Sequence, residues 1–372
     1  MYPKLVVNLE KLKTNIRFLT DNMTAHNLSI TAVTKVHSAN PEVVKVFEKF
    51  PEIEYFGDSR IKNLMTYQHS NKKKILIRIP MHSEVDAVIK YADISFNSEI
   101  STIKLLNQAA KKVGKIHQIL LMVDLGDLRE GFFDGADLMF AVSEIMEMEN
   151  VKLFGLGVNL TCYGAVIADE KNLGELIAYH EKIKAQFNIE LPMISGGNSS
   201  SLYLLDDEKL TLPKGITNLR IGDAFFSGEE TSRGTKYPEM FDDVFVLQAE
   251  IVELKKKPSF PIGNRGVDAF GQIPTFEDKG IRLRGILAVG RQDTVFDGLK
   301  PFDDRLSIVG ASSDHLIVDF TDSEQSYHVG DIVDFKLSYG AMLATFTSKY
   351  ITKEYVDGAG GDSHDISPGN MD

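Results

Sequence analysis

An alternation of short apolar runs with longer amphipathic segments fills the first 220 or so residues, and it constrains the fold more than any other feature of the chain. The runs have the length and apolar composition of strands buried on both faces, whereas the segments between them have a helical period. The eight expected strands are residues 30–35, 53–57, 74–79, 92–96, 116–124, 151–160, 191–195 and 218–222. Eight strand–helix units predict a (β/α)8 TIM-type barrel, with an open doubly wound sheet as the alternative.

The pattern changes after residue 222 to β-type runs separated by Gly- and Pro-containing segments. These runs are residues 244–254, 281–289, 306–309, 316–320 and 332–337. We therefore expect a barrel over residues 1–230 and a C-terminal, mainly β domain over residues 231–356. Residues 357–372 lack an apolar pattern and are expected to form a disordered tail.

Charge and cysteine content restrict the class of protein. Lys and Arg total 41 against 53 Asp and Glu, a net charge of −12 that argues against a nucleic-acid partner. Cys162 is the only cysteine, which excludes an intrachain disulfide and fits a reducing compartment. Charged residues near the start and the lack of a long apolar stretch predict a cytoplasmic protein that does not bind a membrane. The histidines show no metal-site spacing, so no metal is expected.

Lys35 is the polar residue at a predicted strand end that stands out most. It follows the apolar run of residues 30–33 and would lie at the carboxyl end of the first barrel strand, where barrels carry their active sites. A desolvated lysine loses proton affinity and becomes an amine nucleophile suited to Schiff-base chemistry. The alternative is a lysine whose ammonium group reaches solvent at the barrel rim.

Two loops at the same expected end of the barrel have the composition of a phosphate site. Residues 195–201 read SGGNSSS and offer backbone N–H groups and hydroxyls, and residues 219–223 form a second small-residue turn. A tight turn with a helix cap is the alternative for the first loop. An amine on the first strand together with a phosphate loop after the seventh and eighth is a combination that pyridoxal 5′-phosphate satisfies.

Several longer stretches resemble the alanine racemase-like family, the fold type III pyridoxal phosphate enzymes. They are RIPM from residue 78, MVDLGDLREGF from 122, GVNLTCYGAV from 157, ISGGNSSSLY from 194, ASSDHLIVD from 311 and SYGA from 338. The resemblance covers about residues 1–355. It implies a barrel followed by a β domain, pyridoxal phosphate as cofactor, and racemisation of an amino acid at Cα. It also implies ornithine, or else lysine, as the substrate, and a head-to-tail homodimer.

The resemblance carries roles over to individual residues. Lys35 matches the lysine that forms the Schiff base and acts as one base, Arg129 the arginine near the phenolic oxygen, and Arg220 the arginine facing the pyridine nitrogen. A guanidinium is effectively never deprotonated, so Arg220 would keep that nitrogen unprotonated and favour racemisation over transamination. The implied cofactor-binding residues are Lys35, Asn198, Ser199, Arg220, Gly222, Asp223 and Tyr339.

The chain departs from the family at the second base. The tyrosine of the family pattern G-Y-A-D-G is Arg291 here, in GRQDT, and arginine is a poor proton acceptor. Racemisation needs a proton donor on the face of Cα opposite Lys35. The candidates are Asp293, His315, Cys162 and Tyr163. Their alternative roles are, in the same order, a turn cap, a surface histidine, a buried thiol and a core aromatic residue.

A cationic side chain on the substrate calls for an anionic partner. The expected substrate-binding residues are Arg291, Asp293, Ser313 and Asp314, and Asp293 is preferred for a side-chain ammonium group. The alternatives for the function are a racemase of another amino acid such as alanine, a decarboxylase or a metal-dependent aldolase on the same scaffold, and a non-catalytic carrier of the cofactor.

Overall fold

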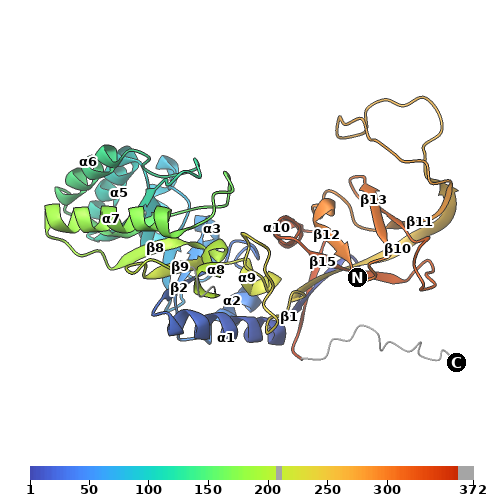
Figure 1. The fold of residues 1–372 in the computed structure, drawn as a ribbon, viewed down its shortest axis with the longest axis horizontal. Helices are drawn as coiled ribbons and strands as arrows, with labels where there is room; N and C mark the ends of the chain where they lie inside the picture. The colour runs from blue at the N-terminus through green and yellow to red at the C-terminus, as the bar shows by residue number, and fades with distance from the viewer. Residues whose placement is uncertain (207–211, 359–372) are drawn as a thin grey trace. The chain divides into compact units, whose positions relative to one another are not determined.

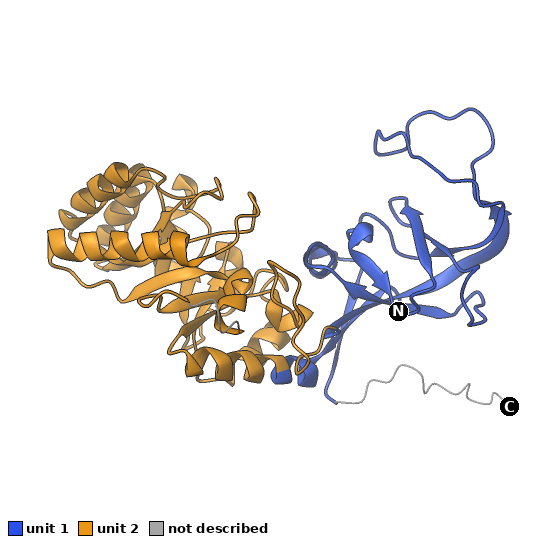
Figure 2. Cartoon of the chain, in the orientation of Figure 1, with its two compact units in different colours: residues 1–14, 243–372 blue, residues 15–242 orange. Residues whose placement is uncertain are grey.

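The computed structural model describes residues 1–206 and 212–358. The chain divides into two compact units, one made of residues 15–242 and the other of residues 1–14 with those from 243 onward (Figure 2). Among the described residues, no helix combines the length and the apolar character that crossing a membrane requires.

The first unit contains a closed barrel of eight parallel strands, each followed by helical structure (Figure 1). The strands are β2 (Ser29–Val33), β3 (Ile53–Asp58), β4 (Lys73–Leu76), β5 (Ile94–Asn97), β6 (His117–Val123), β7 (Val151–Val158), β8 (Met193–Asn198) and β9 (Asn218–Ile221). The helices are α1 (Leu9–Ala25), α2 (Pro41–Glu48), α3 (Ile61–Thr66), α4 (Val85–Tyr91), α5 (Ile100–Lys112), α6 (Gly135–Met146), α7 (Glu170–Phe187), α8 (Tyr203–Asp206) and α9 (Ala224–Ser227). The first residues of α1, up to Thr14, belong to the second unit. The predicted barrel and its eight strands are confirmed.

The barrel closes between its first and last strands, where β2 pairs with β9 in parallel and Ile30 lies opposite Leu219. Large side chains fill the interior, including Tyr55, Phe96 and Phe154 from β3, β5 and β7. Because both faces of the strands are covered, their residues are apolar in almost continuous runs. Chemistry is therefore confined to the strand ends and the loops that follow them.

The second unit is a mainly antiparallel sheet accompanied by helix α10. Its strand order is β12-β15-β10-β11-β14-β13, and β1 pairs with β10 and β16. The elements are β1 (Lys4–Asn8), β10 (Phe245–Pro258), β11 (Ile281–Leu287), β12 (Leu299–Pro301), β13 (Ser307–Ala311), β14 (Leu316–Asp319), β15 (Ile332–Leu337), α10 (Tyr339–Thr347) and β16 (Thr352–Val356). The predicted C-terminal β domain is thus present, with a helix before its last strand.

The division of the chain differs from the expected boundaries. Residues 4–8 were expected in the barrel domain, but they form an antiparallel pair with β10 and a parallel pair with β16. Leu5 and Val7 are fully buried there, so the strand gains its apolar environment from the β sheet. The compact units also separate at residue 243 rather than at 230. Of the expected tail, the part from residue 359 lies outside the described residues.

Candidate active site

Lys35 lies in the turn that follows β2, at the carboxyl end of the barrel, and its side chain is partly buried. The preceding residue fixes this turn to β3. The Thr34 N–H donates to the Gly57 carbonyl at 2.9 Å, and the Thr34 hydroxyl donates to Asp58 Oδ2 at 2.6 Å. Two hydrogen bonds to β3 therefore hold the backbone directly before the lysine.

Asp58, at the end of β3, is the buried acceptor in this arrangement. Its other oxygen, Oδ1, accepts from the Arg60 N–H at 2.9 Å and from Asn63 Nδ2 at 3.0 Å. Burial raises the pKa of the Asp58 carboxyl, while the hydrogen bonds and the positive charge of Lys35 act in the opposite direction. The contact with Thr34 explains why a fully buried carboxyl group occurs next to the lysine.

Asp223 is a second carboxyl group that experiences the charge of Lys35. It lies directly after Gly222, which follows β9. Burial raises the pKa of the Asp223 carboxyl to about 7, the negative charge of Glu229 adds to this, and Lys35 opposes it. Its Oδ1 is buried and has no hydrogen-bond partner among the described residues. Lys35 thus lies within electrostatic range of both Asp58 and Asp223.

The serine-containing segment at the end of β8 joins the loop after β9. Backbone N–H groups of Gly222 and Ala224 donate to Ser199 Oγ at 3.2 and 3.3 Å. Asn198 Oδ1 accepts from the Ser200 N–H at 2.9 Å, and Ser200 Oγ is buried without a partner among the described residues. Two backbone donors thus converge on one oxygen atom, beside a buried hydroxyl with unused hydrogen-bonding capacity.

Gly197, near the end of β8, has a backbone conformation that favours glycine. Its φ is +116°, a conformation that L side chains rarely adopt, and an added Cβ would lie 2.3 Å from Ser201 Oγ. The Ser201 hydroxyl in turn donates to the Gly196 carbonyl at 3.0 Å. The glycine therefore serves the tight packing of this loop.

Arg220, on β9, is almost completely buried at the same end of the barrel. Its Nη1 donates to Ser195 Oγ at 2.7 Å, and its Nη2 donates to the Val158 carbonyl at 2.8 Å and to Asn159 Oδ1 at 3.3 Å. Its guanidinium carbon lies 5.2 Å from the centre of the Phe96 ring. Burial lowers the pKa of Arg220 to about 10, which still leaves the group cationic at neutral pH.

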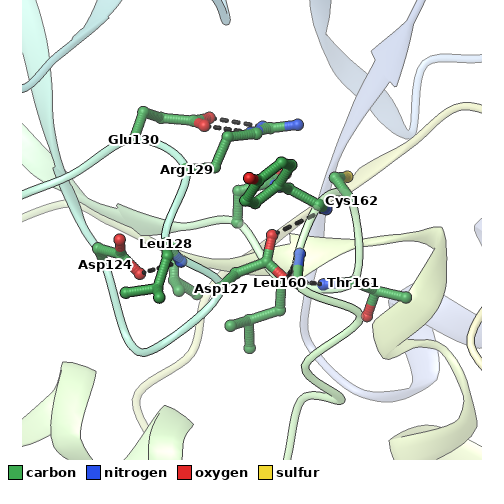
Figure 3. Close-up of polar contacts among 12 residues, drawn as sticks. Asp124, Asp127, Leu128, Arg129, Glu130, Leu160, Thr161 and Cys162 are labelled. Atoms are coloured by element: carbon green, nitrogen blue, oxygen red, sulfur yellow. Dashed lines mark hydrogen bonds and ion pairs between the residues drawn. The ribbon is translucent and has the colours of Figure 1, made fainter.

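Arg129 and Cys162 lie on two neighbouring loops, after β6 and β7 (Figure 3). Arg129 pairs with the carboxylate of Glu130, and the negative charge of Asp127 also acts on it. Cys162 is exposed, and its Sγ lies 3.6 Å from Asn198 Nδ2. The next residue, Tyr163, is 74% exposed, so neither of these two candidates is a core residue.

The remaining sequence candidates belong to the β unit. Asp293 is 4% exposed and accepts from the Gly290 N–H at 3.0 Å and from Ser348 Oγ at 3.3 Å, which is the geometry of a turn cap. Arg291 donates from Nε to the Ala311 carbonyl and packs over two phenylalanine rings.

The turn between β13 and β14 carries three more of the candidates. Asp314 and His315 are exposed in it, with Nδ1 of the histidine 3.4 Å from a carboxylate oxygen of Asp314. Ser313 lies beside them and its hydroxyl donates to Asp314 at 3.3 Å. Tyr339 is partly buried at the start of α10.

Sequence reasoning assigned no role to Asp127 or to Asn159. Asp127 is 1% exposed and accepts hydrogen bonds from the loop that carries Cys162, whereas Asn159 accepts from Arg220. An aspartate within the glycine-containing turn DLGDLREG was the only signal for the first. For the second, the signal was a polar residue immediately after a buried strand.

The barrel end fits pyridoxal phosphate by its chemistry. Lys35 supplies an amine at a strand end, and Arg220 supplies a buried cation. Ser199 marks an oxygen position served by two N–H groups, and the Ser200 hydroxyl is buried and available. Side chains bulkier than hydrogen are restricted at Gly222, where a Cβ would lie 3.1 Å from the Val33 side chain. Among the described residues, no group of three or more His, Cys, Asp or Glu side chains could hold a metal ion.

Comparisons with known proteins agree with this chemistry. The family model for the alanine racemase N-terminal domain matches residues 7–229. The ornithine racemase of Acetoanaerobium sticklandii is 52% identical over 354 residues, which cover 95% of this chain and 99% of that protein. The lysine racemase of Thermotoga maritima is 33% identical over 357 residues, which cover 95% of this chain and 99% of that protein.

A solved structure extends the likeness to the fold. The alanine racemase from Bartonella henselae with covalently bound pyridoxal phosphate matches with a TM-score of 0.71 over 95% of this chain and 99% of its own. At 17% sequence identity, this match shows a shared fold of barrel and β unit.

Proposed function

Because the chain belongs to the alanine racemase family, whose members depend on pyridoxal phosphate, we propose that this amino-acid racemase interconverts L- and D-ornithine. The observation that supports ornithine as the substrate is the 52% sequence identity to an ornithine racemase over 95% of this chain. The more distant lysine racemase makes lysine the expected second substrate. Both are α-amino acids with an ammonium group at the end of the side chain.

We assign the cofactor contacts to residues of the barrel end and to Tyr339 of the β unit. Lys35 would bind the aldehyde carbon of pyridoxal phosphate, Arg220 would interact with its pyridine nitrogen, and Arg129 with its phenolic oxygen. Its phosphate would be held by Asn198, Ser199, Gly222, Asp223 and Tyr339. Bound pyridoxal phosphate withdraws electrons from Cα of an amino acid joined to it and so makes the Cα–H acidic.

The residues of the chain then have to move one proton. With the cofactor and substrate bound, the amine of Lys35 would accept the proton of Cα on one face. Arg220 remains a cation because three protein oxygens accept from its guanidinium, so it gives no proton to the pyridine nitrogen. This arrangement favours return of the proton to Cα, which is the racemase outcome.

The second proton carrier belongs to the exposed candidates, namely His315, Cys162 and Tyr163. Asp293 is left out because its carboxylate is buried and bound within its own turn. A carrier has to reach the substrate and exchange protons with water. Single variants at the four candidate positions test this assignment. It would be overturned if Asp293→Asn lost inversion but kept exchange of the Cα proton, while no variant of His315, Cys162 or Tyr163 did so.

The β unit supplies the substrate side chain with an anionic partner, which we assign to Asp314. This carboxylate is exposed beside Ser313, whereas Asp293 is committed to its turn. We propose a head-to-tail homodimer in the cytoplasm, in which the β unit of one subunit completes the barrel site of the other.

Chiral chromatography of L-ornithine, L-lysine and L-alanine incubated with the enzyme tests the substrate assignment. Ornithine is expected to give the highest kcat/KM, and Asp314→Asn to reduce the preference for ornithine over alanine by roughly tenfold, as expected for a lost ion pair. Asp293→Asn is the matched control and is expected to leave that preference unchanged. An unaltered preference in Asp314→Asn, or racemisation of alanine in place of ornithine, would contradict the assignment.

A further inference from the structure

The segment 160–166, which follows β7, has an irregular backbone and carries two of the proton-carrier candidates. Thr161 and Ala165 have φ values of 71° and 56°, in the left-handed region that residues with a Cβ seldom adopt. Such conformations persist where surrounding contacts hold them. The acceptor for the N–H groups of this segment therefore decides whether it stays in one conformation.

Asp127, from the loop after β6, is that acceptor (Figure 3). Its Oδ1 accepts from the N–H groups of Thr161, Gly164 and Val166 at 3.0, 3.1 and 3.3 Å, and its Oδ2 accepts from that of Tyr163 at 3.1 Å. The carboxylate is 1% exposed. One buried anion thus satisfies four backbone donors of a neighbouring loop.

The two loops also pack closely at this point. An added Cβ on Gly164 would lie 2.8 Å from the Asp127 carbonyl oxygen. The Thr161 hydroxyl donates across the base of the segment to the Val166 carbonyl at 3.0 Å. The segment is therefore closed on itself and attached to Asp127 at its inner side.

The start of the segment reaches the assigned cofactor contacts. Asn198 Nδ2 donates to the Leu160 carbonyl at 3.2 Å and lies 3.6 Å from Cys162 Sγ. Asn159, directly before the segment, accepts from Arg220 Nη2 at 3.3 Å. A shift of the segment would move groups that touch both the phosphate loop and the arginine.

We propose that Asp127 is a positioning residue of the racemase: it holds residues 160–166, with Cys162 and Tyr163, against Asn198 and Arg220. This inference rests on the proposed function, because it gives Asp127 a purpose in that same site. Asp127 acts through the loop and does not touch the reacting atoms.

The chemistry requires a carboxylate at this position. All four partners are N–H donors, so both oxygens have to accept. In Asp127→Asn, one of the two oxygens becomes an NH2 group, which would oppose either the Tyr163 N–H or the three N–H groups on the other side. The amide is nearly the same size, so this variant breaks at least one of the four hydrogen bonds by which Asp127 clamps residues 160–166, and it creates no cavity.

Cys162 provides a direct readout, because it is the only cysteine of the chain. The experiment compares the holoenzymes of wild type, Asp127→Asn and Asp134→Asn. Asp134 is the control, since its carboxylate caps the start of α6 by accepting from the Ala136 N–H at 2.6 Å. Both variants lose one charge and one capping carboxylate. The measurements are the rate at which a thiol reagent labels Cys162, the absorbance of the bound cofactor, and kcat and KM for L-ornithine.

Asp127→Asn is expected to change the labelling rate by roughly tenfold, to shift the cofactor absorbance, and to lower kcat by about 10- to 100-fold, in the range that misplaced catalytic groups produce. Asp134→Asn is expected to match wild type in all three. If the thiol reagent labels Cys162 at the same rate in Asp127→Asn and in wild type, the proposal that Asp127 holds residues 160–166 is wrong. Altered labelling with unchanged absorbance, kcat and KM overturns the positioning role.

Hydrogen exchange of the wild-type holoenzyme needs no variant and decides the matter if Asp127→Asn does not fold. The amides of residues 161, 163, 164 and 166 are expected to be protected, and exchange as fast as in an unstructured peptide would overturn the clamp. A wild-type enzyme that leaves ornithine unchanged would contradict the proposed function. The labelling and exchange results would still show whether Asp127 holds the loop.

Discussion

The positive charge of Lys35 acts on the carboxyl groups of both Asp58 and Asp223, yet the surroundings of these two groups differ. Asp58 has three hydrogen-bond donors, whereas Asp223 has a buried oxygen without a partner among the described residues. Because Asp223 lacks this compensation, burial raises its pKa to about 7. At the scale of single residues, Asp223 is therefore the carboxyl group whose charge state changes near neutral pH.

This pKa predicts a pH dependence of stability. Between the ordinary value of 3.8 and the folded value of about 7, the folded state binds the proton and the unfolded state does not. The free energy of unfolding is then expected to fall as pH rises through this window and to level off above it. From pH 6 to pH 8 the contribution of Asp223 is about 1 kcal/mol.

Asp223→Asn removes the titrating group, so the variant is expected to gain stability relative to wild type as pH rises from 6 to 8. Urea unfolding at the two pH values measures the difference. Glu253→Gln serves as the control, since the hydrogen bonds from Lys257 and Lys255 lower the pKa of Glu253 to about 2, well below this pH range. A stability difference between Asp223→Asn and wild type that is the same at both pH values would contradict the raised pKa.

At the scale of elements, the barrel strands were predictable because burial on both faces leaves a continuous apolar run for each strand. The short strand β1 was assigned to the wrong domain, since its partners β10 and β16 are more than 200 residues away in the sequence. Helix α10 was missed among β-type runs. The local sequence pattern therefore predicts which segments are buried strands, but it does not predict which distant strands pair with one another.

The candidate site shows the same limit. The positions of Lys35, Ser199 and Arg220 at one end of the barrel were predictable, because each is a polar residue that follows or lies on an apolar strand. The clamp of Asp127 was not, because its acceptor role depends on backbone N–H groups 34 to 39 residues further on, which no side-chain pattern reveals. Contacts between a side chain and the backbone of another loop can be recognised only in the three-dimensional structure.

The loop at the end of β8 makes a prediction about cofactor binding. Gly197→Ala forces a Cβ to within 2.3 Å of Ser201 Oγ at a φ of +116°. We expect this variant to bind pyridoxal phosphate at least tenfold more weakly, because the serine loop has to move. Titration of the apoenzyme with the cofactor, followed by absorbance, measures the dissociation constant.

Gly174→Ala is the matched control for this change. Gly174 lies in α7 with open space at its Cβ position, so alanine is expected to leave cofactor binding unchanged and to add up to about 1 kcal/mol of stability. Equal cofactor affinity in Gly197→Ala and wild type would contradict a role for the loop in holding the phosphate.

At the scale of the whole molecule, the barrel unit and the β unit contain different candidate site residues. The barrel unit contains the amine, the buried arginine and the serine loop, while the β unit contains the exposed Asp314 and His315. The protein is an amino-acid racemase of the alanine racemase family. The proposal that it racemises ornithine requires that a proton be removed from Cα and that Cα then be reprotonated.

Incubation of the holoenzyme with L-ornithine in deuterated water tests this claim most directly. The enzyme is predicted to form D-ornithine that carries one deuterium at Cα, as read by chiral chromatography and mass spectrometry, and Lys35→Ala is predicted to form none. Recovery of L-ornithine without deuterium, or loss of its carboxyl group as carbon dioxide, would contradict the account.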